Sequence, residues 1–533
     1  MINPRAMPCD EATIRSTRAG PRCAPDVKSW VLAAAILGSA MAFIDATAVN
    51  VALPAMQRSL STSLAAMQWV VNAYTLFLSA CLLIGGAAGD RFGRRRVFIT
   101  GIAVFAAASM WCGLAPDVVH LILARAVQGI GGALLVPSTL AIIGAAFEMQ
   151  ERGRAIGTWA AFSAVTTAVG PLLGGWLVDA FSWRALFFIN LPIGVLTAWL
   201  ALRHVPESRD PQAPAVLDWR GALLALAGLG SLVFGLIASS GLGWRHPAVL
   251  GSLTAAPLLL AAFLYAEARN PAPMLPLALF RSRMFTAVNL VTFLLYAALG
   301  GALFFLPFSL IEVHGYSATE AGASLLPFTI IMGGLSRWSG GLLDRFGARL
   351  PLIVGPVIAA LGFALLSLPG AGGSYSTTFF PALVILGFGM TISVAPLTTA
   401  VMNAVPDHQV GVASGVNNTV ARAAGLLAVA VLGAVAHDVF DRALDRRLAP
   451  LALPPQVKEA LRSIDGSTVS ASQPPLPERD RSLAESAIAG SFVESFRVVT
   501  LSAAALALAA ALCAALLVPP DLGRPKGAPP GKP

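Results

Sequence analysis

Long apolar runs separated by short polar stretches make up most of the chain. A membrane-spanning helix needs about 20 consecutive apolar residues, within a range of about 17–25. Runs of this length lie at residues 30–53, 68–88, 97–115, 118–138, 155–179, 184–203, 217–238, 247–267, 285–309, 320–338, 351–369, 379–400, 411–435 and 495–518. The pattern therefore predicts an all-α integral membrane protein with fourteen spanning helices.

Composition agrees with a membrane location. Of the 533 residues, 56% are hydrophobic and only 12% are charged, whereas soluble domains carry roughly 25% charged residues. The net charge of +9 comes almost wholly from arginines, which cluster in short loops between the apolar runs. Membrane orientation explains these arginines better than nucleic-acid binding does. We therefore expect no nucleic-acid partner.

The arginines are divided unequally between alternate loops. One set of short loops carries Arg91, Arg94 to Arg96, Arg152, Arg154, Arg203, Arg209, Arg220, Arg269, Arg281, Arg283, Arg345 and Arg349, and the opposite set carries only Arg58, Arg184 and Arg245. The positive-inside rule places the first set in the cytoplasm. Both terminal tails, residues 1–29 and 519–533, are then predicted to be cytoplasmic. The segment 437–494 is predicted to be an external loop, loosely ordered because of its Pro-Pro pairs.

A loop motif occurs twice. The stretch Gly86-Ala-Ala-Gly-Asp90-Arg91-Phe92-Gly93-Arg94-Arg95-Arg96 returns as Gly340-Gly-Leu-Leu-Asp344-Arg345-Phe346-Gly347-Ala348-Arg349. Each copy follows the second helix of a group of six, and such a recurrence indicates two related halves. We predict a six-helix bundle at 30–203, a linker with two extra spanning helices at 204–284, and a second six-helix bundle at 285–518.

Further motifs lie within the predicted helices. They are Ile44-Asp45-Ala46-Thr47-Ala48-Val49-Asn50-Val51-Ala52-Leu53-Pro54, Leu121-x-x-x-Arg125-x-x-Gln128-Gly129-x-Gly131-Gly132, Gly170-Pro171-Leu172-Leu173-Gly174-Gly175, Trp183 to Pro192, and Ala413 to Arg422. Together with the duplicated loop, these motifs resemble those of the major facilitator superfamily, in its fourteen-helix drug:proton antiporter group. The resemblance covers nearly all of residues 30–518. It implies the major facilitator fold and proton-coupled export of lipophilic, often cationic, drugs or toxic compounds across the bacterial inner membrane.

The duplicated loop is the first candidate gate. Its glycines let adjacent helices approach closely, and Asp90 can accept hydrogen bonds from a neighbouring helix N-terminus. Its arginines can pair with carboxylates on the cytoplasmic face. The alternative is a solvated positive-inside loop. The candidate gating residues are Gly86, Asp90, Arg91, Gly93 and Arg94, with Asp344 and Arg345 in the second copy.

The Gly-Pro motif in the fifth predicted helix is the second candidate gate. Pro171 removes a backbone hydrogen bond and kinks a helix. Gly170, Gly174 and Gly175 give a flat face for close packing. Thr166 stands where the family usually has glycine, but the core of the motif is intact. The alternative is a kinked helix that serves only for packing.

Two charges within predicted helices are the candidates for proton coupling. Asp45 is the only acid well within a helix of the first bundle. A carboxylate removed from water binds a proton more readily, so Asp45 can load and release one. Arg125 carries a charge whose placement in a membrane costs roughly 2.5–3.5 kcal/mol or more, so it should face a cavity or a partner. The alternative is a structural pairing of Asp45 with an arginine.

Aromatic and polar residues on cavity-facing helices are the candidates for substrate binding. They are Phe43, Asn72, Tyr74, Phe293 and Tyr296, together with Arg422, whose alternative role is to close a packed helix contact. Aromatic faces attract cations. The ninth to twelfth helices contain no clear mid-membrane acid. We therefore expect monovalent cationic and neutral lipophilic substrates rather than divalent ones.

Several motifs are missing from the sequence. There is no phosphate-binding loop, no nucleophile elbow, and no metal-ligand spacing among the five cysteines. We therefore expect no enzyme activity, no cofactor and no metal. The expected partners are a small lipophilic substrate, protons and membrane lipids. The sequence does not indicate whether a periplasmic adaptor takes part. The alternatives are a dedicated exporter of one endogenous metabolite, conferring self-resistance, and a receptor or channel that uses the fold.

Overall fold

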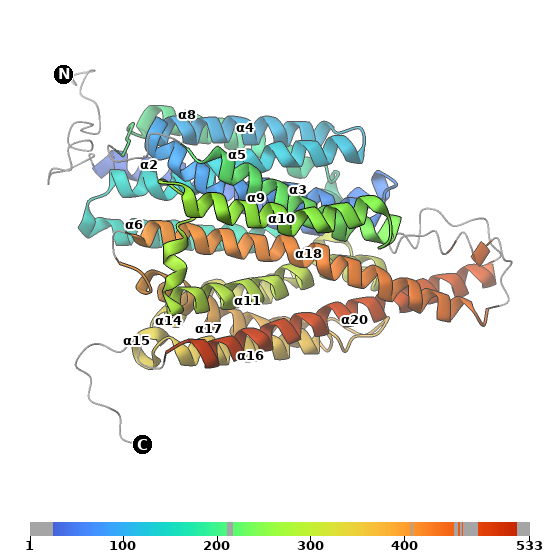
Figure 1. The fold of residues 1–533 in the computed structure, drawn as a ribbon. Coiled ribbons are helices and arrows are strands. Elements are labelled where there is room, and N and C mark those ends of the chain that lie inside the picture. The colour runs from blue at the N-terminus through green and yellow to red at the C-terminus, as the bar shows by residue number, and fades with distance from the viewer. Residues whose placement is uncertain are drawn as a thin grey trace. The chain divides into compact units, whose positions relative to one another are not determined.

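The computed structural model describes residues 25–210, 217–406, 409–451, 457–458, 461 and 478–519. The regular elements among these residues are all helices and none is a strand, which confirms the all-α expectation (Figure 1). The helices up to the start of the second half are α2 (Pro25–Ser59), α3 (Leu64–Phe92), α4 (Arg94–Leu114), α5 (Val118–Ala146), α6 (Met149–Ala180), α7 (Ala185–Phe188), α8 (Asn190–His204), α9 (Trp219–Leu242), α10 (Pro247–Arg269) and the 3-10 turn η1 (Leu277–Arg281). The remaining helices are α11 (Arg283–Phe308), the π turn η2 (Ser309–Val313), α12 (Ala318–Ser324), α13 (Leu326–Gly334), α14 (Ser336–Gly340), α15 (Leu342–Phe346), α16 (Arg349–Leu365), α17 (Phe379–Asn403), α18 (Val410–Leu448) and α20 (Glu478–Leu517).

Two compact units make up the chain. The first contains the residues up to Ala52, Trp69–Leu232 and Ser252–Pro276, and the second contains Leu53–Gln68, Val233–Gly251 and the chain from Leu277 onward. Helices α2, α3, α9 and α10 each contribute to both units. The predicted boundaries between bundles and linker therefore stay a prediction.

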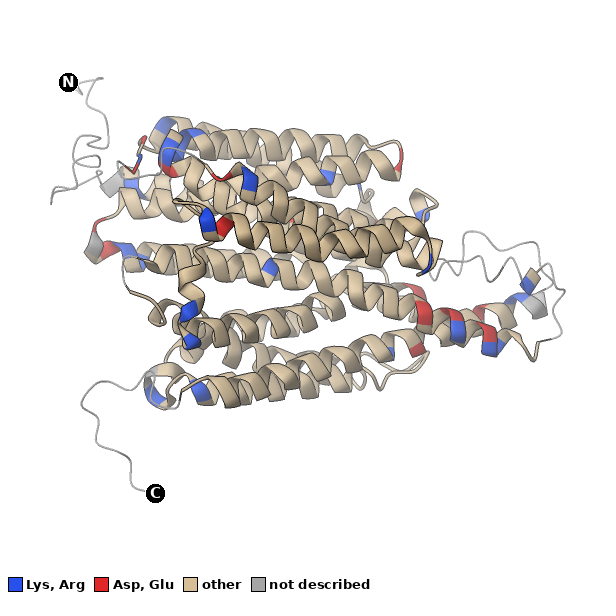
Figure 2. Cartoon of the chain, viewed as in Figure 1, with Lys and Arg blue, Asp and Glu red and all other residues tan. Residues whose placement is uncertain are grey.

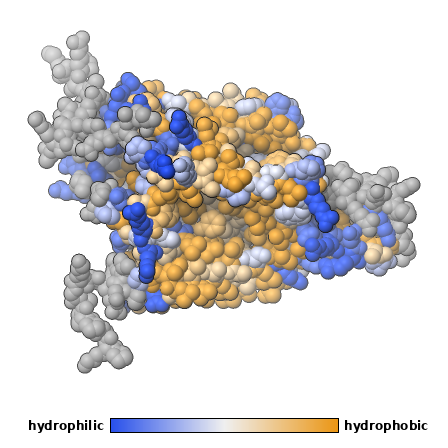
Figure 3. All heavy atoms as spheres, in the orientation of Figure 1, coloured by the Kyte–Doolittle hydropathy of each residue, from blue (hydrophilic) through white to orange (hydrophobic). Residues whose placement is uncertain are grey.

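Twelve helices in the described part of the chain are long and apolar enough to cross a membrane. They correspond to twelve of the fourteen predicted spans. Their outer faces are apolar as well: Val195, Leu258 and Leu516 are 72%, 71% and 73% exposed. Figure 3 shows hydrophobic residues over the flanks of the helices and hydrophilic residues near their ends. Such flanks suit a lipid environment, and the chain is a multi-pass membrane protein.

The predicted spans 320–338 and 351–369 are the two that differ. The first is divided into α12 to α15, and the second is the 17-residue helix α16. Leu325, Leu335 and Gly341, which separate the short helices, keep right-handed backbone angles. The chain therefore continues to turn in one sense while the regular hydrogen bonding is interrupted. Pro327, which has no N–H, and several glycines in this stretch explain the interruption.

The predicted loose loop 437–494 begins and ends in helix, so that expectation is wrong for its two ends. Helix α18 continues to Leu448, and α20 already begins at Glu478. Ion pairs one turn apart support the continuation of α18, as between Arg442 and Asp438 at 2.6 Å. Figure 2 shows these charges on the adjacent ends of α18 and α20. Both Pro-Pro pairs lie outside the described residues.

Close packing of α4 against α5 sets the position of the charged residues in the first unit. A Cβ added to Gly131 would lie 2.6 Å from the backbone nitrogen of Phe105. A Cβ added to Gly101 would lie 2.9 Å from the backbone nitrogen of Leu135. Only glycine permits such an approach. The two helices are therefore held in a fixed register, with Arg125 on the face of α5 that is buried.

Candidate functional site

The two charges predicted to couple protons form a buried ion pair. Arg125 Nη1 donates to Asp45 Oδ2 at 2.6 Å. Their side chains are only 2% and 1% exposed, respectively. Helix α2 supplies the carboxylate and α5 supplies the guanidinium. A short charge-assisted bond between fully buried partners is strongly directional. The two candidates therefore lie side by side, which is compatible both with proton coupling and with the alternative, a structural pairing of Asp45 with an arginine. Their role in transport stays a proposal.

Gln128 completes the arrangement. It belongs to the motif around Arg125 but was not among the predicted site residues. Its Nε2 donates to Asp45 Oδ1 at 2.9 Å, and its Oε1 accepts from Arg125 Nη1 at 2.7 Å. Gln128 lies three residues after Arg125, so both side chains project from one face of α5. The three side chains therefore form a closed ring of hydrogen bonds, in which both carboxylate oxygens of Asp45 accept one bond each. The Arg-x-x-Gln spacing was the available sequence signal.

Arg125 has further contacts that do not depend on Asp45. Its Nε donates to the carbonyl oxygen of Val70 at 3.2 Å. Its guanidinium carbon lies 4.3 Å from the ring centroid of Tyr74 and 5.9 Å from that of Phe187. A desolvated cation–π contact contributes about 2 kcal/mol. Tyr74 was predicted to line a substrate cavity, but it is buried beneath Arg125 and belongs to the charged cluster.

The Gly-Pro motif of α6 packs on α2 directly after Asp45. A Cβ added to Gly174 would lie 2.8 Å from the Cβ of Ala48 and 3.0 Å from its carbonyl oxygen. One added to Gly170 would collide with the hydroxyl of Thr47. Pro171 lies inside the continuous helix α6, and Gly175 is buried. Gly170 and Gly174 therefore fix the position of the turn of α2 that directly follows Asp45.

The first copy of the duplicated loop is held by contacts within the motif. Asp90 Oδ1 accepts from Arg94 Nε at 2.9 Å and from Arg94 Nη2 at 2.7 Å. Asp90 was expected to accept from a neighbouring helix N-terminus, whereas its carboxylate here pairs with its own motif. Gly93 has a φ of 111°, which an L side chain rarely adopts. Gly86 is half-buried and Arg91 is exposed, with its guanidinium over the ring of Phe92.

Glu207 also anchors this loop, and sequence reasoning missed it. Its Oε1 accepts from the backbone N–H of Arg95 at 3.1 Å, and its Oε2 lies 3.7 Å from Arg96 Nε. The Glu207 side chain is only 8% exposed. A Cβ on Gly93 would lie 2.6 Å from Glu207 Oε1, so the glycine also makes room for this acid. An acid directly after an apolar helix, on the arginine-rich side, was the only available signal.

The second copy repeats the backbone feature of the first. Gly347 has a φ of 73° and ends α15, as Gly93 ends the corresponding turn in the first copy. Arg345 is exposed, and its guanidinium lies 5.7 Å from the ring centroid of Phe346. The side chain of Asp344 lies outside the described residues. The left-handed glycine after Asp-Arg-Phe is therefore the feature that the two halves demonstrably share.

The predicted substrate residues do not form one cluster within the described part of the chain. Phe43 is half-buried beside Trp159, with 6.5 Å between ring centroids. Asn72 is 0% exposed, and within the described residues neither of its amide atoms has a hydrogen-bond partner. Phe293 packs against a small cluster of buried alanines.

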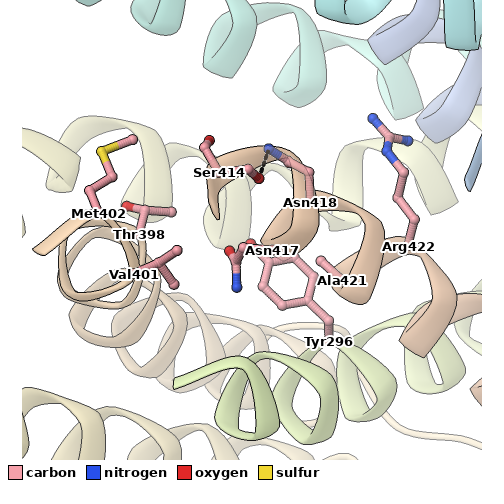
Figure 4. Close-up of a pocket in the computed structure, with 9 residues that line it drawn as sticks. All are labelled: Tyr296, Thr398, Val401, Met402, Ser414, Asn417, Asn418, Ala421 and Arg422. Carbon is pink, nitrogen blue, oxygen red and sulfur yellow. Dashed lines mark hydrogen bonds between the residues drawn. The ribbon is translucent and has the colours of Figure 1, made fainter. Parts of the chain in front are cut away.

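Tyr296 and Arg422 come together in the second unit. Both line a pocket of about 250 Å³ (Figure 4). Of the predicted substrate residues, these two therefore line one pocket, and their role in substrate binding stays a prediction.

Comparisons with known proteins agree with these motifs. Residues 35–429 match the family model of the Major Facilitator Superfamily. A tetracenomycin C resistance and export protein of Streptomyces glaucescens is 35% identical over 497 residues, which cover 91% of this chain and 91% of that protein. The multidrug resistance protein Stp of Mycobacterium tuberculosis (strain CDC 1551 / Oshkosh) is 35% identical over 429 residues, which cover 80% of this chain and 79% of that protein.

A solved structure gives the same fold. The crystal structure of a bacterial homologue of the human lysosomal transporter Spinster, inward-facing and occupied, matches with a TM-score of 0.66. The match covers 93% of this chain and 97% of that chain at 18% sequence identity, so it shows the fold alone. The helical architecture, the family match and the long alignments with resistance proteins lead to one assignment. The chain belongs to the Major Facilitator Superfamily, within its group of drug-resistance exporters.

Proposed function

We propose that this protein exports small lipophilic drugs or toxic compounds across a bacterial inner membrane in exchange for protons, with Asp45 as the proton-binding group. The observation that carries the proposal is the buried ring of Asp45, Arg125 and Gln128. The Arg125 guanidinium and the Asp45 carboxylate lie 2.6 Å apart with almost no exposure. Their ion pair exists only while the carboxylate is charged, so binding of a proton by Asp45 breaks it. Intramembrane ionisable residues are by default functional-site candidates.

Protonation of Asp45 removes the negative charge that Arg125 faces. The charge-assisted bond is then lost, since a neutral carboxylic acid accepts less strongly from a guanidinium. Arg125 keeps the carbonyl of Val70, the amide oxygen of Gln128 and the ring of Tyr74 as partners. The Arg125 guanidinium therefore keeps these contacts on other helices, while its ion pair with Asp45 on α2 is lost. A proton that changes the α2–α5 contact in this way can bias alternating access, because it binds one conformation better than the other.

The breadth of the substrate range separates two versions of this function. The Streptomyces relative is named for resistance to one antibiotic, and the mycobacterial relative is named for multidrug resistance. The first name supports a dedicated exporter of one endogenous compound, and the second supports a broad exporter. We test both with purified protein in proteoliposomes, under an imposed pH gradient, against a panel of lipophilic compounds. Transport of many compounds supports the broad exporter, transport of one supports the dedicated exporter, and no gradient-driven transport contradicts both.

Fourteen spans and cytoplasmic termini complete the proposal. The segment 318–346 keeps turning in the right-handed sense, and α16 is apolar although only 17 residues long, so both are candidates for the two missing spans. A reporter fused near Gly466 should then be external, and one fused after Lys526 should be internal. Both positions lie outside the described residues. The opposite result would reverse the proposed orientation and the face of every loop motif.

Asp90→Asn should impair transport more than it impairs folding. The Asp90 side chain is 36% exposed and pairs with Arg94 one turn away, and such pairs contribute only about 0.3–0.5 kcal/mol to stability. The variant should therefore insert normally, but it loses the charge that orders the loop. We measure efflux at equal expression. The control is Glu151→Gln, which removes an ion-pairing charge with a 51% exposed side chain on the same unit. Normal efflux by the Asp90 variant would indicate a merely solvated loop.

A further inference from the structure

A polar stripe on α18 faces the pocket of the second unit. Ser414, Asn418 and Arg422 follow one another at intervals of four residues, which places them on one helix face. All three line the pocket of about 250 Å³, together with Tyr296 from α11 and Thr398 from α17 (Figure 4). The sequence predicted a cavity role for Tyr296 and Arg422 but not for the stripe. Three helices of one unit therefore present polar groups to a single space.

Buried hydrogen bonds of Asn417 hold α18 in place beside the polar stripe. Asn417 Nδ2 donates to Asn289 Oδ1 at 3.1 Å and to Thr292 Oγ1 at 2.7 Å. These bonds tie α18 to α11, and all three side chains are buried. Asn418, the next residue along α18, lines the pocket and is exposed, and its Nδ2 donates one hydrogen bond to the carbonyl oxygen of Ser414 at 3.2 Å (Figure 4). The polar wall is therefore preorganised, which lowers the entropic cost of binding a ligand.

The chemistry of the pocket wall favours an acceptor or an anion. Arg422 presents a permanent positive charge with N–H donors in a planar fork, and Asn418, Ser414 and Tyr296 add neutral donors. None of the nine described residues that line the pocket is acidic. Arg422 is half-buried, and a guanidinium that is partly removed from water repels a cation and attracts an anion more strongly than one in bulk water does. The pocket wall therefore disfavours the cationic substrates that the aromatic residues alone led us to expect.

We propose that this pocket binds an acidic oxygen group, a carboxylate, phenolate or enolate, carried by the lipophilic compound that the protein exports. The inference rests on the proposed export function and names its substrate class. Arg422 meets the two acceptor atoms of such a group as a bidentate fork, and Asn418 and Ser414 supply further polar contacts. The aromatic ring of Tyr296 covers the adjoining apolar part of the compound.

The charge of the substrate also changes the energetics of export. For a fixed number of protons per cycle, exporting a monovalent anion instead of a monovalent cation changes the net charge moved inward by two positive charges, and a multivalent anion changes it by more. An inside-negative membrane potential therefore drives export of the anion more strongly than export of a matched cation. This dependence on potential is a second readout, and damage to packing alone does not produce it.

The test uses two dyes that share a xanthene core, carboxyfluorescein as the anion and rhodamine 123 as the cation. In phosphatidylcholine proteoliposomes under a pH gradient, the wild type should carry carboxyfluorescein, and an inside-negative potential should accelerate it. Arg422→Gln should raise the KM for carboxyfluorescein by roughly tenfold or more, because a charged hydrogen bond is lost. The KM for rhodamine 123 should not rise. Arg442→Gln, which removes an arginine with a 74% exposed side chain farther along α18, should leave both KM values unchanged.

Each remaining outcome decides the question. If the wild type carries rhodamine 123 but excludes carboxyfluorescein, or if Arg422→Gln leaves the KM for carboxyfluorescein unchanged, the anion site is wrong and proton-coupled export stands. If neither dye responds to the pH gradient, the proposed function fails and the site with it. Should Arg422→Gln fail to insert, Asn418→Asp decides, because a carboxylate placed in the pocket must weaken carboxyfluorescein binding. If phosphatidylglycerol raises the KM for carboxyfluorescein in the wild type but not in Arg422→Gln, the site belongs to a lipid headgroup.

Discussion

Asp45→Asn is expected to abolish efflux driven by a pH gradient. Asparagine has nearly the same size as aspartate, and its oxygen can still accept from Arg125, but it cannot take up or release a proton near neutral pH. Transport should fall to the level of empty vesicles, while the substrate still binds. We measure gradient-driven efflux in proteoliposomes and substrate binding on the same purified protein. Pumping by Asp45→Asn at the wild-type rate would overturn the assignment of Asp45 as the coupling group.

The controls for this variant separate coupling from stability. Breaking a buried ion pair costs about 3–5 kcal/mol when one charge is left behind, so thermal stability is measured in parallel. Asp117→Asn is the matched control: Asp117 caps α5 by accepting from the N–H of His120 at 2.9 Å, and its side chain is 53% exposed. Asn caps a helix as well as Asp does, so this variant should pump normally. Arg125→Lys should fail like Asp45→Asn, because an ammonium does not replace the planar fork that reaches Asp45, Gln128 and Val70.

The periodicity of apolar runs was sufficient to predict most of the fold. Twelve predicted spans are present as helical segments of spanning length. One of these segments joins α7 to α8, and another continues α11 through the π turn η2. Run length does not report where a helix is interrupted, and the stretch 318–346 is interrupted at positions next to Pro327 and several glycines. The ends of the loop 437–494 were missed for the opposite reason. There, charges at intervals of four residues continue α18 beyond the apolar run, and a search for hydrophobicity does not detect them.

The sequence predicted those site residues whose charge is costly to place within a membrane. It did not predict residues whose role depends on a contact partner that is distant in the sequence. Asp45 and Arg125 stand out because a charge within a spanning helix needs compensation. Gln128 and Glu207 became recognisable only when the structure placed Asp45 and the Arg95 backbone opposite them. Tyr74 shows the converse error. An aromatic residue on a helix predicted to face a cavity is consistent with a substrate wall, but here its ring covers Arg125.

The contact between α6 and α2 allows a test of the Gly-Pro motif that does not change any charge. Gly174 faces Ala48, three residues after Asp45, and its missing side chain is what lets the two helices approach. The neighbours that a Cβ would meet are the Cβ, Cα and carbonyl oxygen of Ala48, and none of them is the end of a flexible side chain. An added methyl group must therefore move a helix rather than rotate a side chain.

Gly174→Ala is expected to destabilise the protein by about 1–3 kcal/mol and to reduce transport roughly tenfold or more, because α2 is displaced at the turn beside the ion pair. Gly157→Ala is the matched control on the same helix. It meets nothing within 4 Å, and a Gly-to-Ala change inside a helix stabilises by about 0.5–1 kcal/mol. The same substitution should thus have opposite effects on thermal stability at two positions of α6. Ala48→Gly should partly rescue Gly174→Ala by removing one of the colliding atoms. Full transport by Gly174→Ala, or no rescue by Ala48→Gly, would show that this contact does not control the motif.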